Sequence, residues 1–140
     1  MPPPTRRRVA RVPPGDGLTD AQRARLAHAV ETADGATGLS FLVRVGVLDG
    51  GRAAAEALLA ARGADAARTV LVAVDPPARA LEIVTGSTAS TVLDDRTCAL
   101  ASLTMTTSFA AGDLVGGLCR GLQVLTDHGR AVAHRHLDTL

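Results

Sequence analysis

Apolar residues recur along this chain at two different periods, and each period predicts a different kind of element. Within residues 39–48 every odd position is apolar, which is typical of a strand with one buried face. Residues 69–74 are apolar on both faces, as a central strand must be. Near the C-terminal end apolar residues return at helical spacing and predict a long helix with one buried stripe, namely Leu114, Leu118, Leu122 and Leu125.

Cap and turn residues set the limits of the other elements. Thr19 and Gln22 have the spacing of a capping box and predict a first helix at residues 20–33. A short helix is expected at 53–62. The segment 75–79 is too short for a crossover, so residues 80–85 should return as an antiparallel strand. A helix from Asp94 or Asp95 to about residue 104 and a link at 104–108 precede the last helix, which is expected to end near His128.

The resulting order αβαββαα predicts a three-layer α/β/α sandwich around a small mixed β-sheet. A right-handed crossover makes the first two strands parallel. Residues 18–128 form the expected domain. Residues 1–17 are expected to be a disordered leader rich in Pro and Arg, and residues 129–140 the helix end and a polar tail.

The length of 140 residues and the 46% of hydrophobic residues fit one core. No apolar run approaches the roughly 18 residues of a membrane helix, and the charged N-terminus is not followed by the apolar core of a signal peptide. We therefore expect a soluble protein in the cytoplasm. Cys98 and Cys119 lack CxxC spacing and are expected to be buried, reduced thiols.

All 15 basic residues are arginines, and four of them precede the first acidic residue, Asp16. This leader either contacts an acidic surface or acts as a solubilising tail, and the second interpretation is favoured. Nucleic acid is an unlikely partner, because Phe41 and Phe109 are the only aromatic residues and bases would have nothing to stack on. An unidentified protein partner is the remaining expectation.

Three carboxylates stand where predicted helices begin. Asp113 follows Gly112 at the start of the last helix, and Asp94 and Asp95 start the preceding one. Each is either an N-cap or a ligand held in place by a helix terminus. Other candidate groups are weaker. Asp49 and Asp75 belong to turns, and the spacing of His128, His134 and His136 does not place them together around a metal ion. The sequence contains no P-loop, GxGxxG, HExxH or GxSxG motif.

Several short motifs lie at the ends of these elements: Thr37-Gly38, Thr85-Gly86 with an Asp about eight residues later, and Phe109-Ala110-Ala111-Gly112-Asp113 followed by Gly117. Over residues 18–128 they resemble the TPM domain, the thylakoid-lumen-phosphatase-like family. The runs 93–100 and 106–109 are similar to a small actinobacterial branch of that family without assigned function. The resemblance implies a sheet between helix layers, a divalent-cation site, usually for Ca²⁺ (or Mg²⁺), and the acid-phosphatase activity attributed to a plant member.

Carried over to this chain, that site would use the loop at Gly86, Asp94 or Asp95, and Asp113. The chain departs from the family where relatives carry a Glu, since it has residues 87–90 (Ser-Thr-Ala-Ser), and where relatives carry an aromatic, since it has Leu114. Fewer carboxylates should bind a cation more weakly. We therefore expect a non-catalytic binding or interaction module with at most a weak cation site. The alternative is a metal-dependent, acid-phosphatase-like hydrolase.

Glycines inside the last helix, Gly116, Gly117 and Gly121, are costly there unless a neighbour approaches closely. The sequence predicts that the sheet or another helix packs against them.

Overall fold

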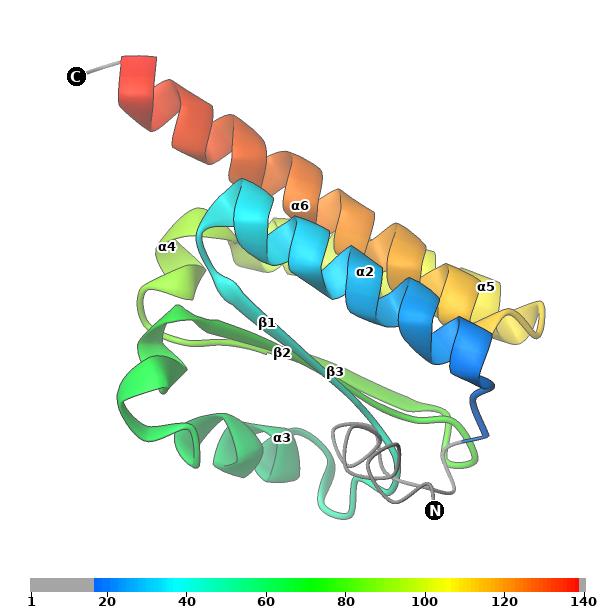
Figure 1. Ribbon diagram of the computed structural model, residues 1–140. Coiled ribbons are helices and arrows are strands. Elements are labelled where there is room, and N and C mark those ends of the chain that lie inside the picture. Colours follow the sequence, from blue (N-terminus) through cyan, green and yellow to red (C-terminus); the bar gives the residue numbers. More distant parts are fainter. Residues whose placement is uncertain (1–16, 139–140) are drawn as a thin grey trace, which may run out of the picture.

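The computed structural model describes residues 17–138, which form a three-layer α/β/α arrangement around a small mixed sheet (Figure 1). The order αβαββαα and the fold class predicted from the sequence are confirmed. The elements are α2 (Asp20–Thr37), β1 (Ser40–Val45), α3 (Gly51–Ala60), the 3-10 helix η1 (Gly63–Arg68), β2 (Thr69–Asp75), β3 (Ala80–Thr85), α4 (Ala89–Val92), α5 (Asp95–Ala110) and α6 (Leu114–Asp138).

Strand β2 lies in the middle of the sheet, parallel to β1 and antiparallel to β3. All seven of its residues are buried, as the apolar run predicts for a central strand. Its alternate side chains enter two separate cores. Val70, Val72 and Val74 face the layer of α2, α5 and α6, whereas Leu71 and Ala73 face α3.

Helix α2 begins at the predicted capping box, because Thr19 accepts from the Gln22 N–H at 3.1 Å and the Gln22 side chain accepts from the Thr19 N–H at 2.8 Å. The helix runs four residues past the predicted end at residue 33 and stops at Gly38, whose φ of 76° suits a glycine. Buried Ala33 and Thr37 continue its core-facing stripe across Gly35. The periodic burial, and not the first glycine, sets the length of this helix.

The predicted link at residues 104–108 is wrong, because α5 is helical throughout this segment. Met105 is fully buried against α6, and the Thr104 and Thr106 hydroxyls donate to the carbonyls of the preceding turn. Hydroxyl side chains that bond back in this way remain compatible with a helix. Likewise α6 continues beyond the predicted end near His128, so the expected polar tail is helical as far as Asp138. The leader lies outside the described residues, except for Gly17.

Two of the three predicted glycines, Gly117 and Gly121, mark a close approach of α6 to α5, whereas a Cβ on Gly116 would overlap the side chain of Asp113, the cap of α6 itself. A Cβ on Gly121 would overlap the side chain of Met105 on α5. A Cβ on Gly129 would lie 2.6 Å from Cγ2 of Thr37 on α2. The bare backbone at these positions therefore lets α6 pack closely between two helices.

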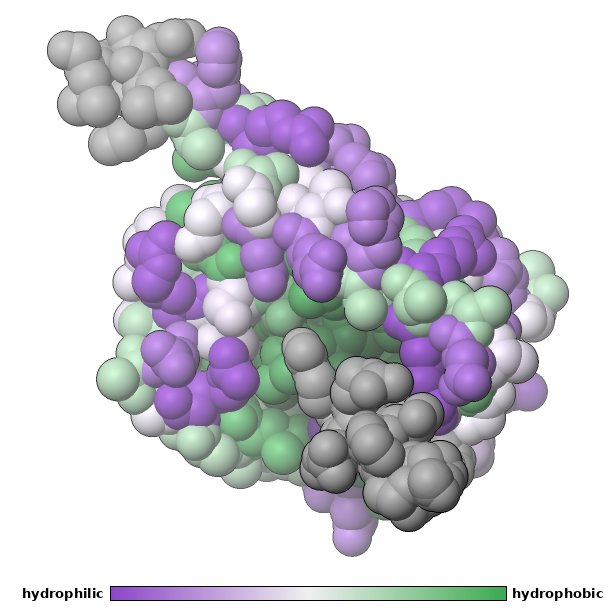
Figure 2. Space-filling model, viewed as in Figure 1, coloured by the Kyte–Doolittle hydropathy of each residue, from purple (hydrophilic) through white to green (hydrophobic). Residues whose placement is uncertain are grey.

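Hydrophilic residues lie along the outer surface of the α2 and α6 layer, and apolar residues lie in the hollow beneath it (Figure 2). Within residues 17–138 no helix combines the length and the apolar character needed to cross a membrane.

Candidate functional site

The structure divides the residues proposed to bind a cation between the two ends of the sheet. Gly86 donates its N–H to the carbonyl of Thr69, the first residue of β2, at 2.9 Å. Gly112 and Leu114, which flank Asp113, lie instead beside Val74 and Pro76 at the far end of β2. A single ion cannot contact both Gly86 and Asp113.

Asp94 and Asp113 are separated in the same way, because they flank opposite ends of α5. This helix has 16 residues, and a helix of that length rises about 24 Å. The predicted site shared by Asp94 or Asp95 with Asp113 is therefore wrong, because the length of α5 keeps these carboxylates apart. Within the described residues no three His, Cys, Asp or Glu side chains cluster in a way that could hold a metal ion.

Asp94 is the N-cap of α5. Its Oδ1 accepts from the Thr97 N–H at 2.9 Å and from the Thr97 hydroxyl at 2.8 Å. These two hydrogen bonds stabilise the ionised form and hold the pKa of Asp94 below its usual value. Asp95 is an exposed residue in the first helical turn, where a carboxylate interacts favourably with the helix dipole. Both residues thus have a structural role as a cap and a first-turn acid.

Gly86 is needed for packing. A Cβ at this position would overlap the Ala66 carbonyl oxygen and would lie 2.7 Å from the carbonyl carbon of Ala67. The backbone of η1 therefore passes directly over Gly86, and any side chain would push the two segments apart. The Gly86 carbonyl itself accepts from the Ser90 N–H at 2.9 Å, which starts the turn into α4.

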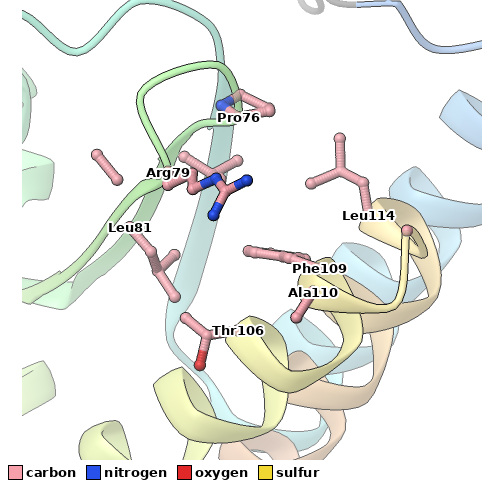
Figure 3. Close-up of a pocket in the computed structure, with 10 residues that line it drawn as sticks. Pro76, Arg79, Leu81, Thr106, Phe109, Ala110 and Leu114 are labelled. Atoms are coloured by element: carbon pink, nitrogen blue, oxygen red, sulfur yellow. The ribbon is translucent and has the colours of Figure 1, made fainter.

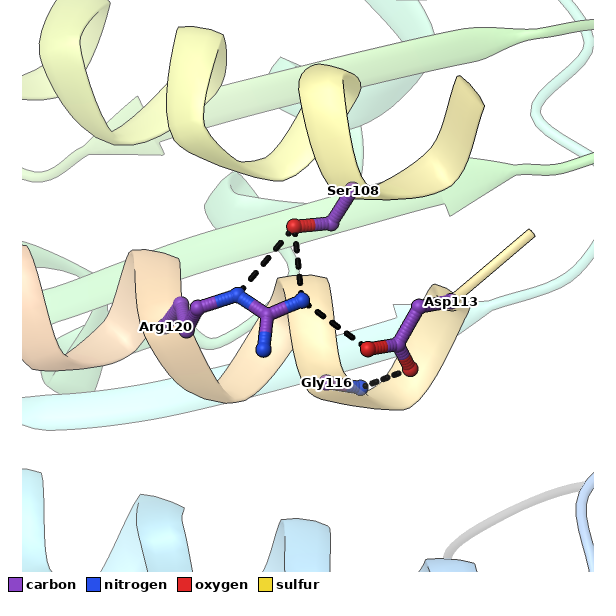
Figure 4. A network of polar contacts seen from close by, with 4 residues as sticks. All are labelled: Ser108, Asp113, Gly116 and Arg120. Atoms are coloured by element: carbon purple, nitrogen blue, oxygen red, sulfur yellow. Dashed lines mark hydrogen bonds and ion pairs between the residues drawn. The ribbon is translucent and has the colours of Figure 1, made fainter. Parts of the chain in front are cut away.

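Asp113 is held by a network at the junction of α5 and α6 (Figure 4). Its Oδ1 accepts from the Gly116 N–H at 3.0 Å, and its Oδ2 accepts from Arg120 Nη2 at 2.9 Å. Arg120 also donates to the hydroxyl of Ser108 on α5, from Nη2 at 2.8 Å and from Nε at 3.2 Å. The hydrogen bond from Arg120, followed by that from Gly116, lowers the pKa of Asp113. Both carboxylate oxygens are therefore already engaged by the protein.

The other titratable candidates are also occupied or dispersed. Asp75 is buried, and its Oδ2 accepts from the Leu48 N–H at 3.0 Å, so it fixes the chain after β1. Cys98 and Cys119 are free and half-buried. Burial raises the pKa of both thiols, that of Cys98 to about 11, so neither is an activated nucleophile. His128 and His134 lie on α6, and the side chain of His136 is outside the described residues.

A cavity of about 460 Å³ opens between the β2–β3 hairpin and the junction of α5 and α6 (Figure 3). We call it the hairpin pocket. It is lined by Val74, Pro76, Arg79, Ala80, Leu81, Thr106, Phe109, Ala110, Gly112 and Leu114. Apart from Arg79 and the Thr106 hydroxyl, the lining side chains are apolar. A concave, mostly apolar wall with a few polar groups is typical of a ligand site.

The pocket brings the hairpin and the α5–α6 junction together, although they are about thirty residues apart in the sequence. No periodicity or motif in the sequence links these two segments, so the sequence does not predict the pocket. Figure 3 shows the guanidinium of Arg79 pointing into the space between Leu81 and Phe109. Among the lining residues that the structure describes there is no carboxylate, histidine or cysteine. The pocket therefore offers a cation and apolar surface, but no acid–base pair.

A protein-family model matches residues 8–126, which is most of the chain, and its description is "Domain of unknown function (DUF5130)". The chain belongs to the DUF5130 family. In this DUF5130 protein the hairpin pocket lies entirely within the matched region. No curated protein matches the chain in sequence.

One solved structure with a similar fold is the solution NMR structure of the N-terminal domain of the cg2496 protein from Corynebacterium glutamicum. It superposes on this DUF5130 chain with a TM-score of 0.69 and 13% sequence identity, over 83% of this chain and 76% of the other. This likeness shows a shared fold. The resemblance to the TPM domain stays a prediction.

Proposed function

We propose that this DUF5130 domain is a non-catalytic binding module whose ligand occupies the hairpin pocket. The observation that carries the proposal is the composition of the pocket wall. The apolar surface comes from three elements, through Leu81 on β3, Phe109 on α5 and Leu114 at the start of α6. One positive charge comes from Arg79 in the hairpin turn. Such a wall can bind and orient a ligand, because apolar burial provides affinity and a single polar group provides direction.

A catalytic role would need further groups near this wall. General acid–base chemistry requires a titratable side chain within hydrogen-bond reach of the substrate, and metal-assisted hydrolysis requires ligands that share a cation. Within residues 17–138, three carboxylates adjoin lining residues in sequence, namely Asp75, Glu82 and Asp113. Each already has a partner: Asp75 accepts from the Leu48 N–H, Glu82 pairs with Arg52, and Asp113 accepts from Gly116 and Arg120. Phosphatase activity, the weak Ca²⁺ site, an unidentified protein partner and a cytoplasmic location remain predictions.

The proposal is tested by filling the pocket. Ala110 is an exposed lining residue at the last position of α5, and Ala60 is an exposed residue at the last position of α3, on the other side of the sheet. Ala110→Trp and Ala60→Trp are therefore a matched pair. We would titrate the full-length, ¹⁵N-labelled chain with 1-octanol and with octanoate and follow the amide signals.

We expect at least one of the two amphiphiles to shift the signals of Leu81, Phe109 and Leu114 in the parent and in Ala60→Trp. These shifts should be lost in Ala110→Trp, because the indole ring occupies the cavity. If neither amphiphile shifts these signals in the parent, or if Ala110→Trp binds as the parent does, the hairpin pocket is not the binding site.

A further inference from the structure

Arg79 has a backbone conformation that is unusual for its residue type. Its φ is 54°, and within the described residues it is the one residue other than glycine with a positive φ. This left-handed region is favourable for glycine and tolerable for asparagine, but it crowds the Cβ of other residues. The hairpin therefore carries a cost at the position where its side chain enters the pocket.

The turn itself does not require an arginine at this place. The Arg79 N–H donates to the Pro76 carbonyl at 3.0 Å and closes the turn. A glycine would make the same backbone hydrogen bond without the strain. Strained residues of this kind often mark a functional position, which directs attention to the side chain of Arg79.

The guanidinium of Arg79 also has no carboxylate partner among the described residues. Within the described residues, Arg52 pairs with Glu56 and Glu82 and Arg120 pairs with Asp113, whereas the exposed Arg44 and Arg96 are, like Arg79, in no ion pair. The entry of its side chain into the pocket distinguishes Arg79 from them. Arg79 is exposed and forms no ion pair with any residue of the described range 17–138. Its charge is therefore available to an anion in the mouth of the hairpin pocket.

We infer that the hairpin pocket binds a small amphipathic carboxylate, whose apolar chain lies against Leu81 and Phe109 and whose carboxylate is bound by Arg79. The inference rests on the proposed function and names the chemistry of its ligand. A guanidinium is suited to this task because it can donate two parallel hydrogen bonds to one carboxylate.

The dimensions favour a small molecule as the occupant. The volume of about 460 Å³ falls within the range of sites for small ligands, which is about 300–1,000 Å³. The wall is bounded by the hairpin on one side and by the α5–α6 junction on the other. The exposed Leu100 and Leu103 on α5 do not line it, so the pocket does not continue into a longer apolar groove through these residues.

The test compares octanoate with 1-octanol, which share an apolar chain and differ in charge. Both are titrated into the full-length parent, Arg79→Gly, Arg79→Lys and the control Arg96→Ala. Arg96 is an exposed arginine at the other end of α5, near Asp94. Dissociation constants come from the amide shifts of Leu81 and Phe109, and thermal midpoints are measured for every variant.

In the parent and in Arg96→Ala we expect octanoate to bind about tenfold more tightly than 1-octanol, as a charge-assisted hydrogen bond would give. Arg79→Gly should reduce this ratio to about one, while its thermal midpoint stays equal or rises because the strain is removed. Arg79→Lys should retain part of the ratio. A loss of binding without a loss of stability separates ligand recognition from a structural role.

Equal binding of the two amphiphiles in the parent, or an unchanged ratio in Arg79→Gly, would overturn this inference and leave the proposed function intact. A fall in the thermal midpoint of Arg79→Gly would overturn the account of the strain. If neither amphiphile binds the parent, the proposed function fails as well.

Discussion

Gly117 on α6 faces Ser108 on α5 so closely that a Cβ on Gly117 would lie 2.7 Å from the Cβ of Ser108. The same atom would lie 2.9 Å from Cε1 of Phe109. Real Cβ atoms do not approach other atoms to such distances, so the two helices depend on the missing side chain. Ser108 is also the residue whose hydroxyl accepts from Arg120. The close approach and the polar network therefore stabilise the same junction.

Gly117→Leu is expected to destabilise the fold by about 1–3 kcal/mol, because it overpacks the junction of α5 and α6. Thermal or urea unfolding of the purified variant measures the effect. The control is Gly35→Ala on α2, where a Cβ would meet nothing within 4 Å. That change should raise stability by about 0.5–1 kcal/mol, because alanine is the better helix former. A Gly117→Leu variant that melts with the parent would refute the close approach.

Gly86→Ala should destabilise the domain strongly even when no divalent cation is present. Its Cβ would overlap the η1 backbone at Ala66 and Ala67, and backbone atoms cannot move aside as a flexible side chain can. Unfolding measured in EDTA and in Ca²⁺ distinguishes this packing role from a metal-binding role. An effect that appears only in Ca²⁺ would contradict the packing explanation.

Asp113 should make stability depend on pH in a defined direction. Its pKa is lowered in the folded state, chiefly by the hydrogen bond from Arg120. The stabilisation is therefore fully present above the unfolded pKa of about 4 and is lost as the pH falls through the lower folded value.

Asp113→Asn should reduce stability at neutral pH and flatten the loss of stability below about pH 4, because the variant has no carboxylate to protonate. Urea unfolding between pH 2 and pH 7 measures both changes. The exposed Asp49→Asn serves as a comparison, because Asp49 precedes α3 and is not one of the residues of this network. If the stability of Asp113→Asn still falls steeply below about pH 4, the acid sensitivity belongs to other groups.

Calorimetric titration with Ca²⁺ should not reveal a site that needs both Asp94 and Asp113, because α5 separates them. If Ca²⁺ binds near Asp94, Asp94→Ala should remove the heat of binding and Asp113→Ala should leave it unchanged. If Ca²⁺ binds near Asp113, Asp113→Ala should remove the heat and Asp94→Ala should leave it unchanged. Loss of the same heat in both single variants would contradict this geometry.

Turnover of an aryl phosphate that is unchanged by Asp113→Ala would remove this residue from any hydrolytic mechanism.

Local patterns in the sequence predicted most of the fold. The capping pair Thr19 and Gln22 located the start of α2, and the apolar run of β2 identified the central strand. Asp94 and Asp113 are N-terminal caps, which is one of the two roles that the sequence indicated for each of them. These features could be predicted because they depend on residues that are neighbours in the chain.

The site could not be predicted because it depends on how the elements are joined. The hydroxyl-rich segment around Thr104 was predicted to be a link between two helices. Burial of Met105 against α6 makes the segment helical instead, and tertiary packing of this kind overrides local preference. The hairpin pocket was missed for a similar reason, since Arg79 and Phe109 meet only in three dimensions.

The central position of β2 has a consequence for how the molecule unfolds. One face of this strand contributes side chains to the core between the sheet and α3, and the other face to the core between the sheet and the layer of α2, α5 and α6. Its two edges form hydrogen bonds with β1 and with β3. Neither helix layer can detach without exposing one face of the same strand to water. The two layers are thus thermodynamically coupled, and the domain should lose its structure in a single two-state transition rather than layer by layer.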